Sequence, residues 1–307
     1  MTHQRAIFCS FIAYFALVLY DTTVKLARQA SVSAFAIMLV VGMMGMIGVM
    51  GLALVKRDAR ILRPSSFRGI AIICLCSVAI RYCNITALNY LSLTLFYAIQ
   101  FTAPLVIALL SVLLKHETLT RLKTGCLFAG FFGILVILAP RLSSATGEAI
   151  GYLTAFSSVF LFAISTVTMH EISQRESVES VQFFNFLSLS LFGLGGAVLG
   201  EPNELHANAL MILLAGGVAF TLGNLLFNQA IKFTVSTNVA QMHYTQIIIG
   251  GIIGYLIWDD VPTWQLAVGS IIIITAGVLV AFQAQKATIL EKIARKKSNR
   301  NYFSFFE

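Results

Sequence analysis

Charged residues are scarce in this sequence, and their scarcity excludes a water-soluble protein. They make up 11% of the 307 residues, whereas hydrophobic residues make up 58%. Soluble domains carry about 25% charged and roughly 45–50% apolar residues. No stretch of soluble composition is long enough to form a separate soluble domain. We therefore expect the whole chain to lie in or on a lipid bilayer.

Patterns that carry catalysis or metal binding are also missing. The sequence has no nucleophile with a base partner and no glycine-rich phosphate loop that follows a strand. The five cysteines all lie in apolar runs and lack zinc-site spacing. We expect no enzymatic activity, no cofactor and no metal site. A membrane-embedded enzyme or an assembly protein stays open as the non-transport alternative, although only His243 is an arguable catalytic group.

Long apolar runs, in contrast, fill the chain. Each is about 20 residues long, enough to cross a hydrocarbon core of roughly 30 Å as a helix. The runs are continuous and lack the alternation of barrel strands, so they predict an all-α integral membrane protein with ten transmembrane helices. These runs are residues 6–29, 32–55, 69–90, 93–114, 121–140, 148–170, 180–199, 208–231, 236–257 and 263–284.

The positions of the basic residues predict the orientation. With the N-terminus in the cytoplasm, seventeen of the 21 Lys and Arg residues fall on the cytoplasmic side. Only Arg28 and Arg141 fall outside, and Lys25 and Arg81 lie within runs. This bias indicates an even number of spans with both termini cytoplasmic. The basic tail 286–307 is expected to lie on the anionic inner leaflet, and the net charge of +8 requires no nucleic-acid partner.

The sequence repeats itself once. The stretch "ALNYLSLTLFYAIQFTAPLVIALL" aligns with "AIKFTVSTNVAQMHYTQIIIGGII", so that Ala87 matches Ala230 and Tyr90 matches Phe233. We expect two five-helix units, 1–145 and 146–285. Because five is odd, the second unit is predicted to cross the membrane in the opposite sense. Inverted repeats of this kind place a binding site near the midplane and permit alternating access.

These residues also carry a resemblance to a known family. The stretch "YLSLTLFYAIQFTAPLVIALLSVLLKHETLT" resembles the EamA-type repeat of the drug/metabolite transporter superfamily. The resemblance covers residues 6–284 as two copies, and the second copy departs from it where Gln246 and Ile247 replace Ala103 and Pro104. It implies a ten-helix transporter of small organic solutes with a central cavity. Substrates in that superfamily range from amino acids and amines to nucleoside derivatives and drugs.

Arg81, in the middle of an apolar run, is the main candidate for a binding residue. A central arginine costs roughly 2.5–3.5 kcal/mol on insertion scales, so a partner is expected. Apart from Asp21, at the edge of the middle third of 6–29, no acidic residue lies in the middle third of any run, which favours a carboxylate of the solute as that partner. Asn84 lies one turn later, and Asn224 and Asn228 stand at and after the equivalent position of the second half. The structural alternative is that Arg81 holds helices together through a carbonyl or a protein carboxylate.

Further polar and aromatic residues lie in the run 93–114 of the first half. Tyr97, Gln100 and Phe101 share one helical face, and they are expected to bind or stack on the solute. Pro104, a turn further on, removes a backbone hydrogen bond and is predicted to make a joint or to free a carbonyl for a ligand.

The equivalent run 236–257 contributes Gln241 and Tyr244 to the same predicted site. Histidine is a side chain that can titrate near neutral pH, so His243 is the candidate for proton coupling, with a structural histidine or sodium coupling as the alternatives.

Asp21 and Lys25 are spaced like an ion pair within one helix. A structural pair is favoured for them, and an outer gate is the alternative.

Together these features predict a secondary active transporter of a carboxylate-bearing metabolite in a bacterial cytoplasmic membrane. Amino acids and their derivatives, S-adenosylmethionine among them, fit the expected site, and an exporter of drugs or signalling compounds is the alternative. The expected partners are the solute, the bilayer and a coupling proton or sodium ion. A monomer is plausible, and the sequence does not determine the direction of transport.

Overall fold

The computed structural model describes eight stretches of the chain, and every regular element in them is a helix. The described residues are 3–57, 67–113, 121–138, 148–172, 176–199, 206–233, 245–261 and 263–279. The helices are α1 (His3–Gln29), α2 (Ala34–Lys56), α3 (Phe67–Tyr90), α4 (Leu93–Gln100), α5 (Ala103–Leu113), α6 (Arg121–Leu138), α7 (Glu148–Ile172), α8 (Val178–Val198), α9 (Ala207–Phe233), α11 (Thr245–Trp258) and the helix Trp264–Leu279.

The described helices overlap the apolar runs that the sequence predicts, and none extends more than three residues beyond its run. Six of them are long and apolar enough to cross a membrane, namely those in α1, α2, α3, α7, α8 and α9. Four shorter apolar helical segments, over 93–107, 124–137, 248–258 and 264–279, occupy the remaining runs. The chain is thus an all-helical protein with several apolar spans, as its composition predicts.

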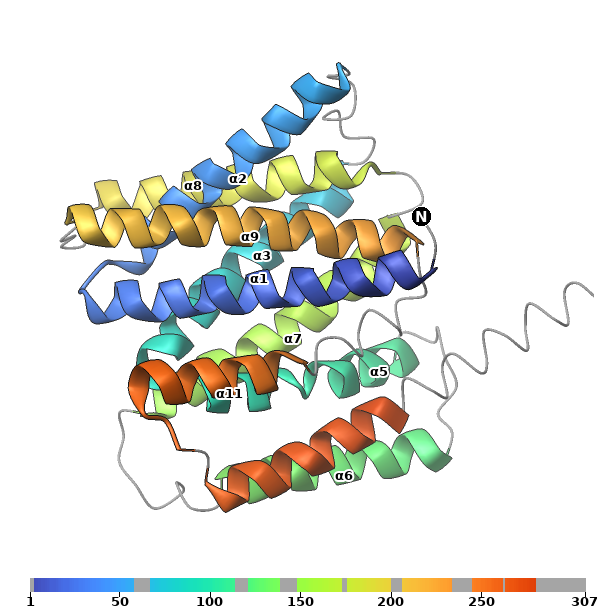
Figure 1. Cartoon of the computed structure of the whole chain (residues 1–307). Coiled ribbons are helices and arrows are strands. Elements are labelled where there is room, and N and C mark those ends of the chain that lie inside the picture. Colours follow the sequence, from blue (N-terminus) through green and yellow to red (C-terminus); the bar gives the residue numbers. More distant parts are fainter. Residues whose placement is uncertain are drawn as a thin grey trace, which may run out of the picture.

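The six long helices form one body in which the two halves of the sequence alternate (Figure 1). α1 packs on α9, α2 on α8 and α3 on α7, and these are the three most extensive contacts in the described structure. α4 packs on α11, and α6 lies beside the helix Trp264–Leu279 (Figure 1). Each helix pair therefore joins a helix of the first half to one of the second.

Glycines let α2 and α8 approach closely. A methyl group added at Gly42 would lie 2.7 Å from the backbone nitrogen of Ser190, and one at Gly193 would lie 2.5 Å from that of Leu39. Small residues permit such contacts between helices in a membrane, where packing rather than the hydrophobic effect drives association. Gly42 of α2 and Gly193 of α8 thus allow the two backbones to lie close together.

Local bonds close the helix ends. Ser33, Ser92 and Ser177 each accept a hydrogen bond from a backbone N–H in the first turn of α2, α4 and α8. α2 ends at Arg57, whose backbone is left-handed with φ 52° and ψ 29°, and whose N–H bonds to the carbonyls of Ala53 and Leu54.

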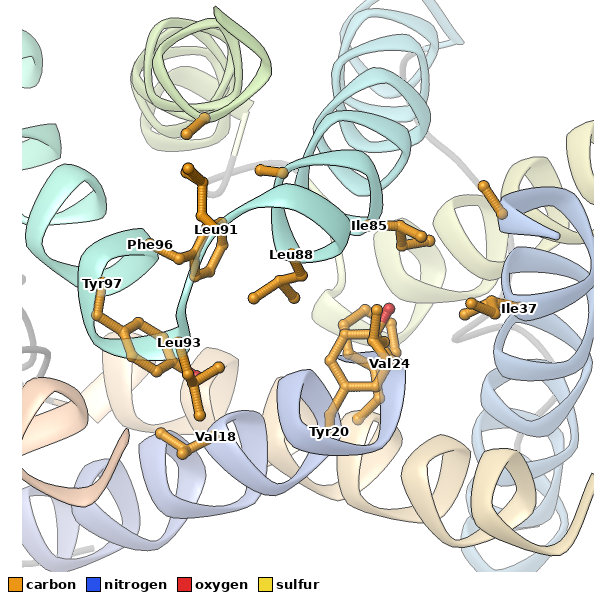
Figure 2. Close-up of a cluster of buried hydrophobic side chains, with 14 of the residues drawn as sticks. Val18, Tyr20, Val24, Ile37, Ile85, Leu88, Leu91, Leu93, Phe96 and Tyr97 are labelled. Atoms are coloured by element: carbon orange, nitrogen blue, oxygen red, sulfur yellow. The ribbon is translucent and has the colours of Figure 1, made fainter. Parts of the chain in front are cut away.

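The apolar core lies where α1, α2, α3 and α4 meet (Figure 2). Tyr20 of α1, Ile37 of α2, Ile85 of α3 and Tyr97 of α4 are each at most 3% exposed. Close packing at this junction fixes the directions of the polar residues that share these helices.

Candidate functional site

Arg81 lies on α3 beside this core and is half-buried. Its Cζ atom lies 4.5 Å from the ring centroid of Phe220 on α9 and 6.0 Å from that of Tyr20 on α1. The two rings also contact each other, with centroids 4.4 Å apart. Aromatic faces attract a cation and lower the cost of holding it in an apolar region. The guanidinium is therefore positioned by rings from both halves of the sequence.

A carboxylate near Arg81 comes from α1, where the sequence argument did not place one. Asp21 is 7% exposed, and its Oδ2 atom accepts a 2.8 Å hydrogen bond from the hydroxyl of Tyr97 on α4. The guanidinium of Arg81 lies over the ring of Tyr20, the residue that precedes Asp21 on α1. This corrects the expectation that the protein supplies no carboxylate near Arg81, because α1 packs against α3 and brings Asp21 within range.

Arg81 and Asp21 nevertheless form no direct ion pair. In the part of the chain that the structure describes, no carboxylate oxygen lies within 4 Å of the Arg81 nitrogens. Tyr97 is the one hydrogen-bond donor to Asp21 among the described residues, and it bonds to Oδ2. The buried Asp21 and the half-buried Arg81 thus lie on neighbouring helices without a direct ion pair.

Gln100 connects three helices at this site. Its Nε2 atom donates to Oδ1 of Asn84 on α3 at 3.0 Å and to Oγ of Ser158 on α7 at 2.8 Å. The hydroxyl of Ser158 donates to the carbonyl of Ala155 at 2.7 Å. Sequence reasoning missed Ser158, because a serine in a membrane helix usually bonds to its own backbone and gives no sign of a further partner.

The chain breaks its helix where Pro104 predicts a joint. α4 ends at Gln100 and α5 begins at Ala103. The N–H of Thr102 bonds to the carbonyl of Ile99, and Phe101 is fully buried. α4 is attached to α1 through Tyr97 and to α7 through Gln100, whereas these bonds do not involve α5.

The second half contributes fewer described residues to the site. The Nδ2 atom of Asn224 donates to the carbonyl of Phe220, one turn earlier on α9, at 2.8 Å. Gln241, His243 and Tyr244 lie outside the described residues, as does the side chain of Asn228. The predicted contribution of these four remains a prediction.

Lys25 pairs with a residue other than the one expected. Its Nζ atom lies 3.6 Å from Oδ2 of Asp260 and 4.5 Å from the ring centroid of Trp258. Trp258 also donates from Nε1 to Oε1 of Gln29 at 2.9 Å. The expected pairing of Lys25 with Asp21 along α1 is thus replaced by a contact between α1 and the end of α11.

The described residues offer no obvious metal site. No group of three His, Cys, Asp or Glu residues lies close enough together within them to hold a metal ion. A cavity of about 700 Å³ lies between α3 and α8 and is mostly apolar, with Cys74, Tyr82, Cys83 and Phe192 in its lining. The charged and polar cluster around Arg81 is therefore the strongest candidate for binding a polar solute.

Comparison with known proteins identifies the repeat. The sequence profile of the EamA-like transporter family matches residues 4–139 and again residues 149–282. The chain is 24% identical over 191 residues to an S-adenosylmethionine uptake transporter of Rickettsia prowazekii, covering 62% of this chain. The present chain spans 63% of the length of that relative.

Two further similarities bear on direction and fold. A pseudopaline exporter of Pseudomonas aeruginosa is 24% identical over 203 residues, which cover 65% of this chain and 69% of the exporter. A protein of known crystal structure superposes with a TM-score of 0.64 at 17% identity and covers 91% of this chain and 98% of its own, which supports the fold alone.

Proposed function

Because the chain belongs to the EamA-like transporter family, we propose that it carries a small carboxylate-bearing solute across the bacterial cytoplasmic membrane by alternating access. The observation that carries this proposal is Arg81, a half-buried arginine in an apolar helix with no described carboxylate within ion-pairing distance. A guanidinium presents paired N–H donors that match a carboxylate in a bidentate arrangement. A bound carboxylate completes the set of partners that an arginine at this depth requires.

The proposed topology has ten spans in two inverted five-helix units, 1–145 and 146–285, with the termini in the cytoplasm. The packing supports it, because an axis that exchanges the two units turns the α1–α9 pair into the α3–α7 pair and leaves α2–α8 as itself. With this topology, Arg81 and Asn224 are expected to lie at equivalent depths. The joint between α4 and α5 supports alternating access, since broken helices occur at the binding sites of inverted-repeat transporters.

The substrate class we favour is an amino acid or an amino-acid derivative, with S-adenosylmethionine as the first compound to test. The Rickettsia relative is named as a transporter of that compound. S-adenosylmethionine carries a carboxylate, which Arg81 is suited to bind. Asn84, Asn224, Asn228 and Gln241 are assigned to its polar remainder, and Tyr244 is assigned to stacking. Tyr97, Gln100 and Phe101 are buried in contacts with neighbouring helices, so their part is to hold the site in place.

Lys25 and Asp260 are suited to act as an outer gate. Their contact joins α1 in the first unit to the residue that follows α11 in the second, and it is more than half shielded from solvent. Separating two paired charges is costly, so the contact favours the closed position until the units move. Coupling by a proton at His243 or by sodium stays part of the proposal.

The decisive experiment measures binding and uptake with purified protein. A thermal-shift screen of metabolites is expected to select carboxylates, and radiolabelled S-adenosylmethionine is expected to accumulate in proteoliposomes. Arg81→Ala is expected to weaken binding about 100-fold, since truncating one side of a buried charged contact costs roughly 2–5 kcal/mol. Arg81→Lys should recover little, because lysine keeps the charge and loses the paired donors.

Arg68→Ala is the matched control, because Arg68 lies on the same helix at its exposed start. It is expected to leave binding unchanged. Stabilisation by cations that lack a carboxylate, or unchanged binding in Arg81→Ala, would contradict the proposal.

Export is the second candidate for direction, and similarity to the pseudopaline exporter favours it. Uptake into vesicles in which the protein has a known orientation separates the two directions. Accumulation only in inside-out vesicles indicates export.

A further inference from the structure

Asp21 and Arg81 form a pair of opposite charges that the folded protein leaves incompletely neutralised. Asp21 is 7% exposed and is bonded by Tyr97 at Oδ2. Arg81 lies over the ring of Tyr20, the residue that precedes Asp21, yet none of its nitrogens lies within 4 Å of a described carboxylate oxygen. A buried charge is stable only when a close group of opposite charge or a hydrogen-bond partner compensates it. A separated pair therefore indicates a place for a ligand that carries both charges.

The groups around Asp21 leave its charge available to a ligand. Tyr97 on α4 donates to one oxygen, which leaves Oδ1 and its lone pairs for a second donor. Lys25, one turn along α1, is the nearest other cation of its helix, and it is engaged with Asp260 and the ring of Trp258. Tyr20, the neighbour of Asp21, packs its ring on Phe220 beneath the guanidinium of Arg81.

The geometry of Arg81 matches this arrangement from the other side. The rings of Phe220 and Tyr20 hold the guanidinium, and in the described residues no carboxylate occupies its N–H donors at ion-pairing distance. Figure 2 shows Tyr20 projecting from α1 towards the core and Tyr97 reaching back towards α1 from α4. Residues from α1, α3, α4 and α9 thus fix both charges in one place.

We propose that Asp21 and Arg81 together bind the head group of an α-amino acid, with the guanidinium on its carboxylate and the Asp21 carboxylate on its ammonium. The ammonium and the carboxylate of an α-amino acid are carried on adjacent carbon atoms, so one small head group can pair with both residues. Tyr97 holds the Asp21 carboxylate in position through its hydrogen bond. This inference rests on the proposed transport function and assigns the ammonium group of the favoured amino-acid substrates to Asp21.

The test compares ligands that differ by one charge. S-adenosylmethionine, its decarboxylated analogue and its deaminated 2-oxo analogue are measured by calorimetry on the purified full-length protein. Methionine, 3-(methylthio)propylamine and 4-(methylthio)butyrate form a second set in case the adenosyl group is not accepted. The zwitterion of either set is expected to bind about 100-fold more tightly than both analogues, because each analogue leaves either Asp21 or Arg81 without a partner of opposite charge.

Two variants assign each charge to its residue. Asp21→Asn keeps the size of the side chain and a partner for Tyr97. In this variant, the analogue without the ammonium should bind at most about threefold more weakly than the zwitterion, while the analogue without the carboxylate should still bind about 100-fold more weakly. Arg81→Gln should show the reverse. Glu179→Gln removes another carboxylate that is paired with a lysine, and it should keep both penalties.

The outcomes separate this inference from the proposed function. Equal binding of the zwitterion and the amine-free carboxylate by wild-type protein overturns the inference and leaves transport of carboxylates intact. Zwitterion-selective binding without uptake in proteoliposomes supports the site and contradicts the transport proposal. Binding of no zwitterion in either set overturns the inference. The comparison of ligands on wild-type protein is decisive even if a variant fails to fold.

Discussion

Arg81 on α3 and Asn224 on α9 are equivalent when the two halves of the sequence are aligned, and the structure uses them differently. Arg81 lies over rings from two other helices, and its neighbour Asn84 bonds to Gln100 on α4. Asn224 donates to a carbonyl of its own helix. Among the described residues, the repeat therefore supplies a common scaffold, while the arginine that we propose to bind the solute belongs to the first half.

The same two halves are alike where α2 meets α8. Gly42 of the first half and Gly193 of the second each bring the backbone of the facing helix close. Equivalent helices thus share packing and differ in polarity. Symmetry is retained where two backbones fit together, and it is lost around Arg81, where we propose that one small asymmetric molecule is bound.

Exchanging the two polar residues tests how far the halves differ. The double change Arg81→Asn with Asn224→Arg keeps the total charge and moves the cation to the second half. We expect it to weaken solute binding about 100-fold, as much as loss of the arginine alone, because Asp21 and the rings around Arg81 stay in place. Isothermal calorimetry measures the effect, and Asn224→Ala alone should cost tenfold or less. Full binding by the exchanged protein would show that the halves are interchangeable.

The shared α2–α8 contact gives the next largest effect. Gly193→Ala places a methyl group 2.5 Å from the backbone nitrogen of Leu39, so the helices must separate. We expect a loss of about 3 kcal/mol in unfolding free energy, at the upper end for overpacking. Gly195→Ala, two residues away with open space around it, should stabilise by roughly 0.5–1 kcal/mol through helix propensity. Denaturant titration in detergent compares them, and equal effects would rule out a close contact at Gly193.

The two charged contacts between the halves are expected to make smaller contributions to stability, and these contributions are expected to differ. Lys56 bonds to Glu179 where α2 ends and α8 begins, but its side chain is 47% exposed. Lys56→Met is expected to cost at most about 1 kcal/mol. Lys25→Met, at a side chain only 10% exposed, should cost more because it leaves Asp260 without its partner. Melting temperatures of both variants at low and high salt give the comparison, and a larger effect of Lys56→Met would reverse the ranking.

Much of the fold could be predicted from apolar runs, because a bilayer requires each crossing segment to satisfy its own backbone. The interruption near Pro104 also followed from the chemistry of proline. Both features depend on residues close together in sequence. The structure confirms helices over the runs and a helix break at residues 101–102, just before this proline.

The partners of the charged side chains could not be predicted in the same way. Asp21 and Tyr97 are 76 residues apart, and their contact depends on how α1 and α4 are rotated about their axes. The spacing of Asp21 and Lys25 favoured a local pair, but Asp260 and Trp258 offer Lys25 an anion and a ring together. Tertiary contacts of this kind override a local preference worth only about 0.2–0.5 kcal/mol.

Arg57, which ends α2 with a left-handed backbone, bears on protein engineering. Glycine adopts this conformation freely, whereas for other residues the conformation costs roughly 1–2 kcal/mol of free energy. Arg57→Gly is therefore expected to make the purified protein more stable to heat. The arginine, however, belongs to the basic loop that we assign to the cytoplasmic side, and the insertion machinery of the cell reads such charges while the chain is being made. Stability in detergent therefore favours glycine at position 57, whereas correct insertion into the membrane favours arginine.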